Sequence, residues 1–489
     1  MKKYPIIFTK WKRFQFILTL AIMTIVAVSC GDDDDNDVIP PLDNIVTIAQ
    51  GSNDLSILVD ALGRVDGLVD DLSDENGNFT VFAPTNAAFT ALLGTIGQSS
   101  LDDIPEDVLE RILRYHVISG AALASTDLSD GQVANTLLTG ESVTVSISGS
   151  SVSINSSNVT TPNVSASNGI VHIIDAVLVP SLEASIVNTV VEPAYFNKDF
   201  SVLTSAVVTA GLLPTLIDTN EEYTVFAPTN AAFEAAGITS LDGLTANDLS
   251  PILLYHVLDS EVVEENLPAT GSAVTTLGGD FYLSINSNGV FINGTTQVTA
   301  TDIDADNGVV HVINRTLTPP SNNIVEIAVA ASQADPGAEF GQLVAALTAV
   351  ESNMEAADLV TVLSSASAED GAPFTVFAPT DAAFNQLYID AGVDDLDALV
   401  DAVGIGTIEA VLLYHVIGGA RVFSTDLPNL TSNTVSTLGG TFTLDLATLT
   451  ITETDAELNL NMDDEAEIIG TDILGTNGVI HTIDKVILP

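Results

Sequence analysis

The stretch Phe79–Phe89 reads FTVFAPTNAAF, and its local chemistry decides the fold of this chain. The threonine, valine and phenylalanine that follow Phe79 favour a half-buried strand. Pro84 disfavours helical backbone at the residue before it, so it marks a corner. Thr85 or Asn86 is then placed to cap a helix. We therefore predict a strand, a corner and a helix start.

This stretch returns almost unchanged at Tyr223–Phe233 and at Phe374–Phe384. Two further motifs follow each copy in the same order: a Tyr-His pair after a helix-like pattern, and an Asn-Gly-x-x-His box at the end. A chain of 489 residues has room for about three domains. The spacing predicts three homologous domains rather than a solenoid of short repeats. The predicted domains are residues 43–180, 183–319 and 323–489, and the short linkers between them predict that neighbours touch.

Taken together, the TVFAPT box, the Tyr-His pair and the Asn-Gly-x-x-His box resemble the fasciclin domain, in three tandem copies. The resemblance implies an α+β fold, in which each domain is a β-sandwich or wedge of about seven strands with packed helices. It also implies a non-enzymatic role in adhesion or in contact with an extracellular matrix.

The N-terminal residues have the pattern of a secretory signal. Five Lys and Arg residues precede an apolar run from Phe16 to Val28, which is shorter than the roughly 20 residues that span a bilayer. The run ends in Ala-Val-Ser-Cys, which resembles the lipobox of bacterial lipoproteins with Cys30 as the lipidated residue. We predict a lipoprotein signal peptide at residues 1–29 and a lipid anchor at Cys30. Cys30 is the only cysteine, so no intramolecular disulfide stabilises the chain.

Residues 30–42 form a short acidic tether that begins with four consecutive aspartates after Gly31. The tether is either a plain solvated spacer or a signal for export to the outer face of an outer membrane, which such acidic residues resemble. The whole chain has a formal charge of −53, from 12 Lys and Arg against 65 Asp and Glu. Removal of the signal peptide would lower the charge by a further five, which argues against binding to nucleic acid. We expect a surface-exposed lipoprotein of the outer membrane.

All six histidines lie in the repeated boxes, two in each domain. Two imidazoles are too few for a closed zinc site, and no cysteine is available to complete one. The alternative is that each histidine and its neighbouring tyrosine hydrogen-bond the backbone in a packed site. We favour this structural role for the following motif residues: Tyr115, His116, His172, Tyr255, His256, His311, Tyr414, His415 and His481.

One candidate binding motif comes from the resemblance alone. In matrix relatives, adhesion is assigned to an Asp-Ile pair just before the Asn-Gly-x-x-His box. Here Asp302-Ile303 and Asp472-Ile473 occupy that position, whereas domain one has Asn163-Val164. The alternative is that the isoleucine is part of the core and that the aspartate begins a strand.

Other chemistry has little support in the sequence. No serine recurs in step with the histidines, and no Gly-x-Ser-x-Gly motif is present, so we expect no enzyme activity. Asp302, Asp304 and Asp306 alternate as in an EF-hand loop, but Asn307 stands where glycine is required. We expect no cofactor, although weak Ca²⁺ binding to the acidic surface stays open. The expected partner is an extracellular protein or glycan at the cell surface, and the alternative function is a glycan-binding module for polysaccharide capture. The single tryptophan, Trp11, leaves with the signal peptide, which disfavours stacking on sugars.

Overall fold

The computed structural model describes residues 42–334, 337–352, 358–430, 432–453 and 465–489. Cys30, the predicted signal peptide and all of the predicted tether except Leu42 lie outside the described residues. From Asp43 onward the chain forms one unit that contains three seven-stranded sheets. In the part of the chain that is described, no helix combines the length and the apolar character needed to cross a membrane.

Domain one has the strand order β2-β1-β7-β6-β5-β4-β3. Its strands are β1 (Phe79–Pro84), β2 (Val117–Ser119), β3 (Val133–Asn135), β4 (Ser142–Ser148), β5 (Ser151–Ile154), β6 (Ser157–Ala166) and β7 (Gly169–Ile174). Its helices are α1 (Ile45–Gln50), α2 (Ser56–Leu62), α3 (Leu68–Ser73), α4 (Asn86–Thr95) and α5 (Glu106–Tyr115).

Domain two repeats this order as β9-β8-β14-β13-β12-β11-β10. Its strands are β8 (Tyr223–Pro228), β9 (Val257–Leu258), β10 (Ala273–Thr276), β11 (Gly279–Asn286), β12 (Gly289–Ile292), β13 (Thr296–Ala305) and β14 (Gly308–Ile313). Its helices are α6 (Ser181–Ile186), α7 (Glu192–Tyr195), α8 (Ser201–Thr209), α9 (Leu213–Leu216), α10 (Asn230–Ala235) and α11 (Ala246–Leu254).

Domain three has the same order again, β16-β15-β21-β20-β19-β18-β17. Its strands are β15 (Phe374–Pro379), β16 (Val416–Gly418), β17 (Thr434–Ser436), β18 (Thr441–Asp445), β19 (Thr450–Glu453), β20 (Ala466–Gly475) and β21 (Gly478–Ile483). Its helices are α12 (Ile324–Ser332), α13 (Gly341–Glu351), α14 (Leu359–Ser364), α15 (Asp381–Ala391), α16 (Leu396–Val403) and α17 (Ile405–Tyr414), together with the 3₁₀ helix η6 (Ser424–Asn429).

The repeated strand–corner–helix stretch lies inside each sheet. In domain one, β1 pairs antiparallel with β2 on one side and parallel with β7 on the other, with Phe82 opposite His172. The strand ends at Pro84, where the proline predicted a corner. Thr85 then caps α4, because its hydroxyl accepts a hydrogen bond from the N–H of Ala88 at 3.2 Å.

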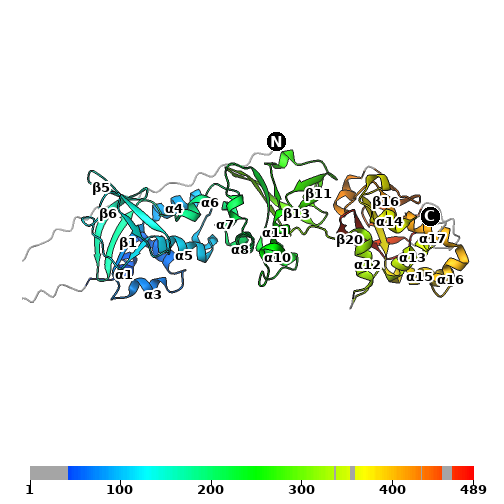
Figure 1. Ribbon diagram of the computed structural model, residues 1–489, viewed down its shortest axis with the longest axis horizontal. Helices are drawn as coiled ribbons and strands as arrows, with labels where there is room; N and C mark the ends of the chain where they lie inside the picture. Colours follow the sequence, from blue (N-terminus) through cyan, green and yellow to red (C-terminus); the bar gives the residue numbers. More distant parts are fainter. Residues whose placement is uncertain (1–41, 335–336, 353–357, 431, 454–464) are drawn as a thin grey trace, which may run out of the picture. The chain divides into compact units, whose positions relative to one another are not determined.

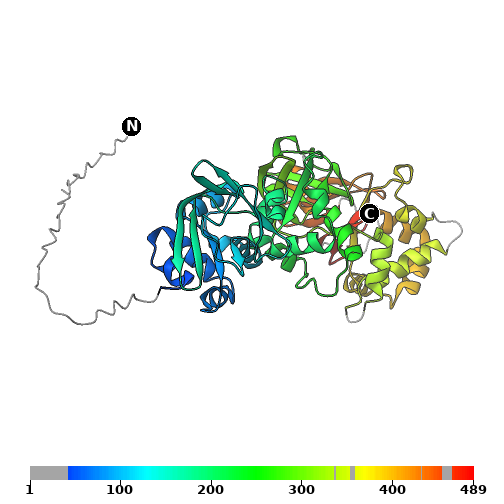
Figure 2. The ribbon, with the colours of Figure 1, turned by 60° about the vertical axis from the view of Figure 1, so that its left-hand side comes forward.

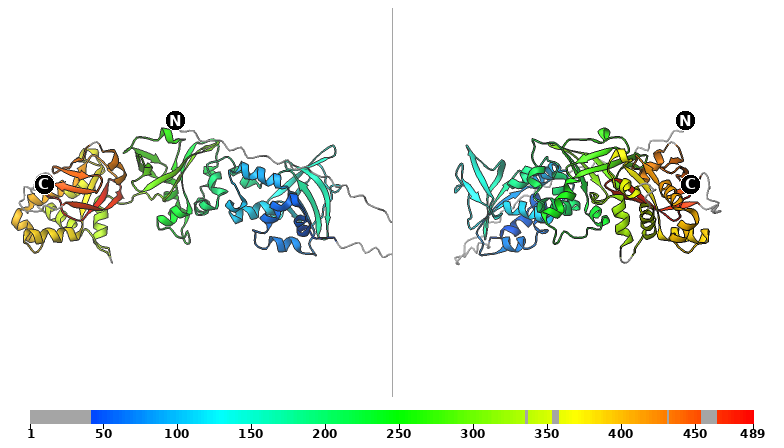
Figure 3. Two further views of the ribbon diagram at one scale, coloured as in Figure 1. Left: turned by 180° about the vertical axis from the view of Figure 1, so that it is seen from behind. Right: turned by 45° about the vertical axis from the view of Figure 1, so that its right-hand side comes forward.

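Each sheet separates two apolar regions. In Figure 1, the blue helices of domain one lie beside its cyan strands, and Figures 2 and 3 show the yellow helices of domain three beside its orange and red strands. One core lies between sheet and helices, and its members in domain one include Val81, Leu109 and Ile112. A second core lies on the other side of the sheet and is built around Phe82 and Val143. The prediction of an α+β fold with seven strands and packed helices in each domain is confirmed.

Candidate functional site

In each domain the Tyr-His pair lies at the C-terminal end of a helix, which is α5, α11 or α17. The tyrosine hydroxyl hydrogen-bonds this helix to a strand of the sheet. Tyr255 donates a hydrogen bond through its hydroxyl to the carbonyl oxygen of Asp280 at 2.8 Å, and it accepts one from the amide of Asn293 at 3.2 Å. Tyr115 donates in the same way to the carbonyl of Ser142 at 2.9 Å. The motif tyrosines therefore join helix to sheet, as Tyr414 also does in domain three through the carbonyl of Thr441.

The first histidine of each domain is buried and uses both ring nitrogens on backbone groups. His256 is 2% exposed. Its Nδ1 lies 2.8 Å from the carbonyl oxygen of Ile252, and its Nε2 accepts a hydrogen bond from the N–H of Leu317 at 2.9 Å. Since a backbone N–H can only donate, Nε2 must be unprotonated and Nδ1 must carry the hydrogen. Burial lowers the pKa of His256 to about 4, and the pKa values of His116 and His415 fall to about 4 for the same reason.

The second histidine of each domain has the opposite tautomer. The Nε2 of His311 lies 2.9 Å from the carbonyl oxygen of Val262, and its Nδ1 accepts from the N–H of Asp302 at 3.3 Å. His172 and His481 make the equivalent pairs of bonds. Both nitrogens of these rings are occupied, so none of the six is positioned to bind a metal ion. Among the described residues, no group of three or more His, Cys, Asp or Glu side chains has the arrangement of a metal site.

The Asp-Ile pair lies in a β-bulge opposite this second histidine. The pairing of β13 with β14 shifts between Ala300 and Ile303, so that two residues of β13 lie opposite His311. Asp302 has a left-handed backbone with φ of 58°. Its carboxylate accepts a hydrogen bond from the N–H of Glu264 at 2.8 Å. Asp302 thus has a structural role in holding the loop that follows β9.

Asn163 performs the same task in domain one, which lacks the Asp-Ile pair. It has φ of 61°, and its amide oxygen accepts from the N–H of Ser125 at 2.7 Å. Its amide nitrogen donates to the hydroxyl of the same serine at 2.7 Å. An asparagine therefore satisfies the geometry of the bulge without a charge.

The two Asp-Ile pairs differ in accessibility. The side chain of Asp302 is 43% exposed, and Ile303 is partly buried against the core. Asp472 is only 8% exposed, whereas Ile473 is 39% exposed. The carboxylate of Asp472 accepts from the N–H of Ser424 at 2.8 Å and pairs with the hydroxyl of the same residue. Only the aspartate of domain two is open to solvent.

Sequence reasoning did not assign a role to the side chain of the asparagine in the Asn-Gly-x-x-His box. Asn307 is 1% exposed, and its amide oxygen accepts from the N–H of Val190 at 2.8 Å. Its amide nitrogen donates to the carbonyl oxygen of Leu216 at 2.9 Å. The side chain therefore hydrogen-bonds the sheet to the segment before α7 and to the end of α9. Its repetition in all three boxes was the available signal.

The glycine after this asparagine allows two backbones to approach closely. A Cβ atom at Gly308 would lie 1.9 Å from the carbonyl oxygen of Tyr223 in the parallel strand β8. Gly308 also has φ of 134°. The Asn-Gly pair is thus a packing requirement as well as a turn.

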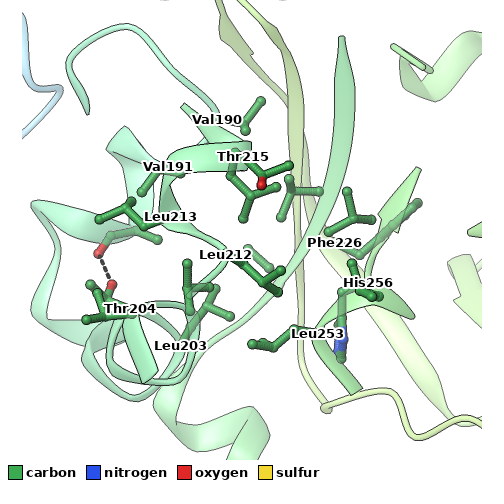
Figure 4. A pocket seen from close by; sticks show the side chains of 18 of the residues that line it. Val190, Val191, Leu203, Thr204, Leu212, Leu213, Thr215, Phe226, Leu253 and His256 are labelled. Atoms are coloured by element: carbon green, nitrogen blue, oxygen red, sulfur yellow. Dashed lines mark hydrogen bonds between the residues drawn. The ribbon is translucent and has the colours of Figure 1, made fainter. Parts of the chain in front are cut away.

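Figure 4 shows an apolar cavity in domain two, between α8, α9, α11 and β8. Its volume is about 50 Å³, and its lining includes Leu203, Leu212 and Leu253 with His256 at one side. Domains one and three have cavities at the equivalent position, of about 20 and 40 Å³. Small-molecule sites enclose roughly 300–1,000 Å³, so these cavities are too small for a ligand.

A larger groove of about 430 Å³ lies where domain one meets domain two. Its lining includes Gln98 of domain one together with Glu192, Ile303, Asp304 and Asp306 of domain two. Burial raises the pKa of Glu192, and the negative charge of Asp306 adds to this effect. The groove is acidic and lies directly beside Asp302.

Comparison with known proteins agrees with this architecture. A model of the fasciclin domain matches residues 53–180, 198–319 and 345–489. The chain belongs to the fasciclin family. Protein sll1483 of Synechocystis is 42% identical over 138 residues, which are 28% of this chain and 74% of that protein. Fasciclin domains are associated with cell adhesion and with contacts to the extracellular matrix.

Two mammalian fasciclin proteins match longer stretches at lower identity. Periostin of Homo sapiens is 25% identical over 436 residues, which are 89% of this chain and 45% of periostin. Transforming growth factor-beta-induced protein ig-h3 of Sus scrofa is 28% identical over 248 residues, which are 50% of this chain and 35% of that protein. The chain thus spans less than half the length of either of these relatives.

Proposed function

We propose that this fasciclin protein is a non-enzymatic adhesion protein of the cell surface, and that Asp302-Ile303 of domain two is its principal contact. The observation that carries the proposal is the exposed carboxylate of Asp302, held in a hydrogen-bonded bulge in a chain of three fasciclin domains. The family's association with adhesion and matrix contacts supports a role without enzyme activity.

The surroundings of Asp302 support a protein partner with basic groups. The adjoining groove brings Glu192, Asp304 and Asp306 to one face, and the whole chain has few cations of its own. A basic partner would therefore meet a complementary potential, which favours fast and selective association.

The test replaces Asp302 by asparagine, the residue type that Asn163 provides at the same position of domain one. Asp302→Asn removes the charge while Asn163 indicates that the bulge can keep its geometry. We expect cells that carry Asp302→Asn to adhere at least several-fold less than wild-type cells, with an unchanged circular dichroism spectrum. Normal adhesion by Asp302→Asn cells would remove this site from the proposal. Normal adhesion by a whole-gene deletion would remove the adhesive function, and capture of glycans would then be the better proposal.

We further propose that the mature protein is anchored in the outer membrane through a lipid on Cys30 and is presented outward on the acidic tether. The lipobox-like end of the apolar run supports this proposal. Metabolic labelling with a fatty-acid analogue should mark the wild-type protein and leave Cys30→Ala unmarked. Equal labelling of both proteins would contradict the anchor, and protease treatment of intact cells tests the outward presentation.

A further inference from the structure

The outward face of β11 in domain two is covered by domain three. Asn286 donates a hydrogen bond through its side-chain amide to the carbonyl oxygen of Thr425 at 2.8 Å. Asn429 donates from the other side to the carbonyl oxygen of Ile285 at 2.7 Å. These two bonds hold η6 of domain three against the end of β11.

An arginine and a tyrosine form the centre of this contact. The guanidinium carbon of Arg421 lies 4.0 Å from the ring centroid of Tyr282, and Phe423 contacts the same ring with centroids 6.3 Å apart. Arg421 is 9% exposed, and its guanidinium donates to the carbonyl oxygens of Gly475 at 3.3 Å and Thr476 at 3.1 Å. In the described part of the chain it makes no ion pair with a carboxylate. A desolvated arginine over an aromatic face is a strong form of the cation–π interaction. The ring of Tyr282 is therefore the main electrostatic partner that domain two offers to this cation.

Comparison with domain one shows that the fold of a single domain does not require Tyr282 on this strand, whereas Arg421 also donates to the carbonyl oxygens of Gly475 and Thr476 in its own domain. The motif tyrosines align the strands of the two domains, because Tyr115 bonds the carbonyl of Ser142 and Tyr255 bonds the carbonyl of Asp280. Two residues further along, Thr144 of domain one therefore occupies the position of Tyr282 in domain two. The next outward residue is Ser146 in domain one and Ser284 in domain two. Both residues of domain one are exposed, whereas Ser284 is fully buried. The same strand thus has a solvated face in domain one and a covered face in domain two.

The covered region includes the aspartate of the second Asp-Ile pair. A Cβ atom at Gly294 of domain two would lie 2.6 Å from the carboxyl carbon of Asp472 and 2.8 Å from the ring of Phe423. Asp472 is therefore buried beneath the turn between β12 and β13. Asp302 has no such cover, which explains why Asp472 is buried while the equivalent Asp302 is exposed.

The contact is polar and incompletely paired. The buried hydroxyl of Ser284 lies beside the carboxylate of Asp426 and partly offsets the rise in the pKa of Asp426 that burial causes. Two other buried polar atoms of the contact, Arg421 Nε and Thr425 Oγ1, have no hydrogen-bond partner within the described residues. Each of these groups would regain a hydrogen bond from water if the two domains separated. The burial of unpaired groups offsets part of the cation–π attraction, so the contact is suited to reversible opening.

We propose that domain two acts as a removable cover on domain three, fastened by Tyr282 and Arg421, and that Asp472 becomes available to a partner only when the cover opens. The availability of Asp472 for adhesion rests on the proposed function, but the cover itself does not. Asp302 would then be the constitutive contact of the protein and Asp472 a latent one.

Thiol labelling of the purified, unlipidated chain tests the cover. In a Cys30→Ser background, Ser284→Cys places a near-isosteric thiol under the cover, and Ser146→Cys places a matched thiol on the exposed face of domain one. We expect the thiol at position 284 to react with a maleimide at least about 100-fold more slowly than the thiol at 146. Equal rates would overturn the proposal.

Two substitutions then open the cover, and Tyr282→Thr does so without removing a hydrogen bond within domain three, whereas Arg421→Ala also removes bonds to the carbonyl oxygens of Gly475 and Thr476. Tyr282→Thr introduces the residue type of Thr144, and Arg421→Ala introduces that of Ala122 at the equivalent place in domain one. Each should accelerate labelling at position 284 by at least about tenfold, as expected for loss of a desolvated cation–π contact. The double variant should gain little more than either single variant. Hydrogen exchange in β8 should stay unchanged, and general loss of protection in domain two would overturn the proposal.

An adhesion assay tests the latent role of Asp472 separately from the existence of the cover. Cells that carry Tyr282→Thr should gain adhesion that disappears on addition of Asp472→Asn, a change that Asn163 and Ser125 show to be compatible with the bulge. No gain in adhesion, despite faster thiol labelling, would overturn the latent role of Asp472. Adhesion through Asp302 would be unaffected by that result.

Discussion

Replacement of His256 by alanine should destabilise domain two strongly at neutral pH. The substitution leaves the N–H of Leu317 without its acceptor, since His256 Nε2 receives this bond at 2.9 Å inside the core. An unpaired buried group costs about 1–3 kcal/mol. The cavity left by the ring adds to this cost, and the total should approach the 3–5 kcal/mol typical of a large buried ring replaced by alanine.

Acidification provides an independent check on the same reasoning. Burial lowers the pKa of His256 to about 4 in the folded protein, whereas the unfolded chain has the ordinary value near 6.5. Between these two pH values, His256 therefore binds a proton in the unfolded state and not in the folded state. The free energy of unfolding contributed by His256 is complete above about pH 6.5 and falls by about 3 kcal/mol as the pH drops to about 4. The stability difference between wild type and His256→Ala should shrink over this range.

The measurement is urea unfolding of the purified chain at several pH values between 7 and 4, followed by hydrogen exchange of peptides from β8 and β14 so that domain two is observed by itself. Ser287→Ala, at an exposed loop position, is the control and should match wild type. A stability difference that stays constant from pH 7 to pH 4 would refute the assigned tautomer and its hydrogen bonds. An unchanged stability at pH 7 would refute the structural role itself.

Three further predictions concern domain two and its cover. Asn307→Ala should lower the free energy of unfolding of domain two by about 2–5 kcal/mol in the same urea experiment, because it removes the partner of several buried backbone groups. Gly308→Ala should prevent native pairing of β8 with β14, since its Cβ would collide with a backbone oxygen at 1.9 Å; a native hydrogen-exchange pattern would contradict this. Asp426→Asn should slow maleimide labelling of Ser284→Cys several-fold, because burial raises the pKa of Asp426 and thus disfavours the carboxylate under the cover. Faster labelling in that variant would count against the buried carboxylate of Asp426 as a source of opening.

The sequence predicted the elements of each domain well where local chemistry decides the outcome. The strand of Phe79–Phe89 ends at its proline and the following helix begins at its threonine cap, because both effects act within a few residues. The apolar residues Val143, Val145 and Ile147 alternate with polar ones in the sequence, and β4 buries Val143 and Val145 on its inward face because successive side chains point to opposite faces. Three copies of these local signals were enough to indicate three domains, and their resemblance to the fasciclin domain implied the α+β class.

The tertiary structure alone decided which partners these residues meet. Nothing local indicates that Asn307 reaches a carbonyl oxygen 91 residues earlier in the chain. The same is true of the contrast between Asp302 and Asp472, which have the same neighbours in sequence and the same place in a bulge. Their exposure differs because Tyr282 and Arg421 bring domain two over one of them, and a contact between residues so far apart depends on the folded surfaces of both domains. A local pattern fixes a residue's backbone and the face on which it lies, but the neighbouring domain decides whether that face meets water.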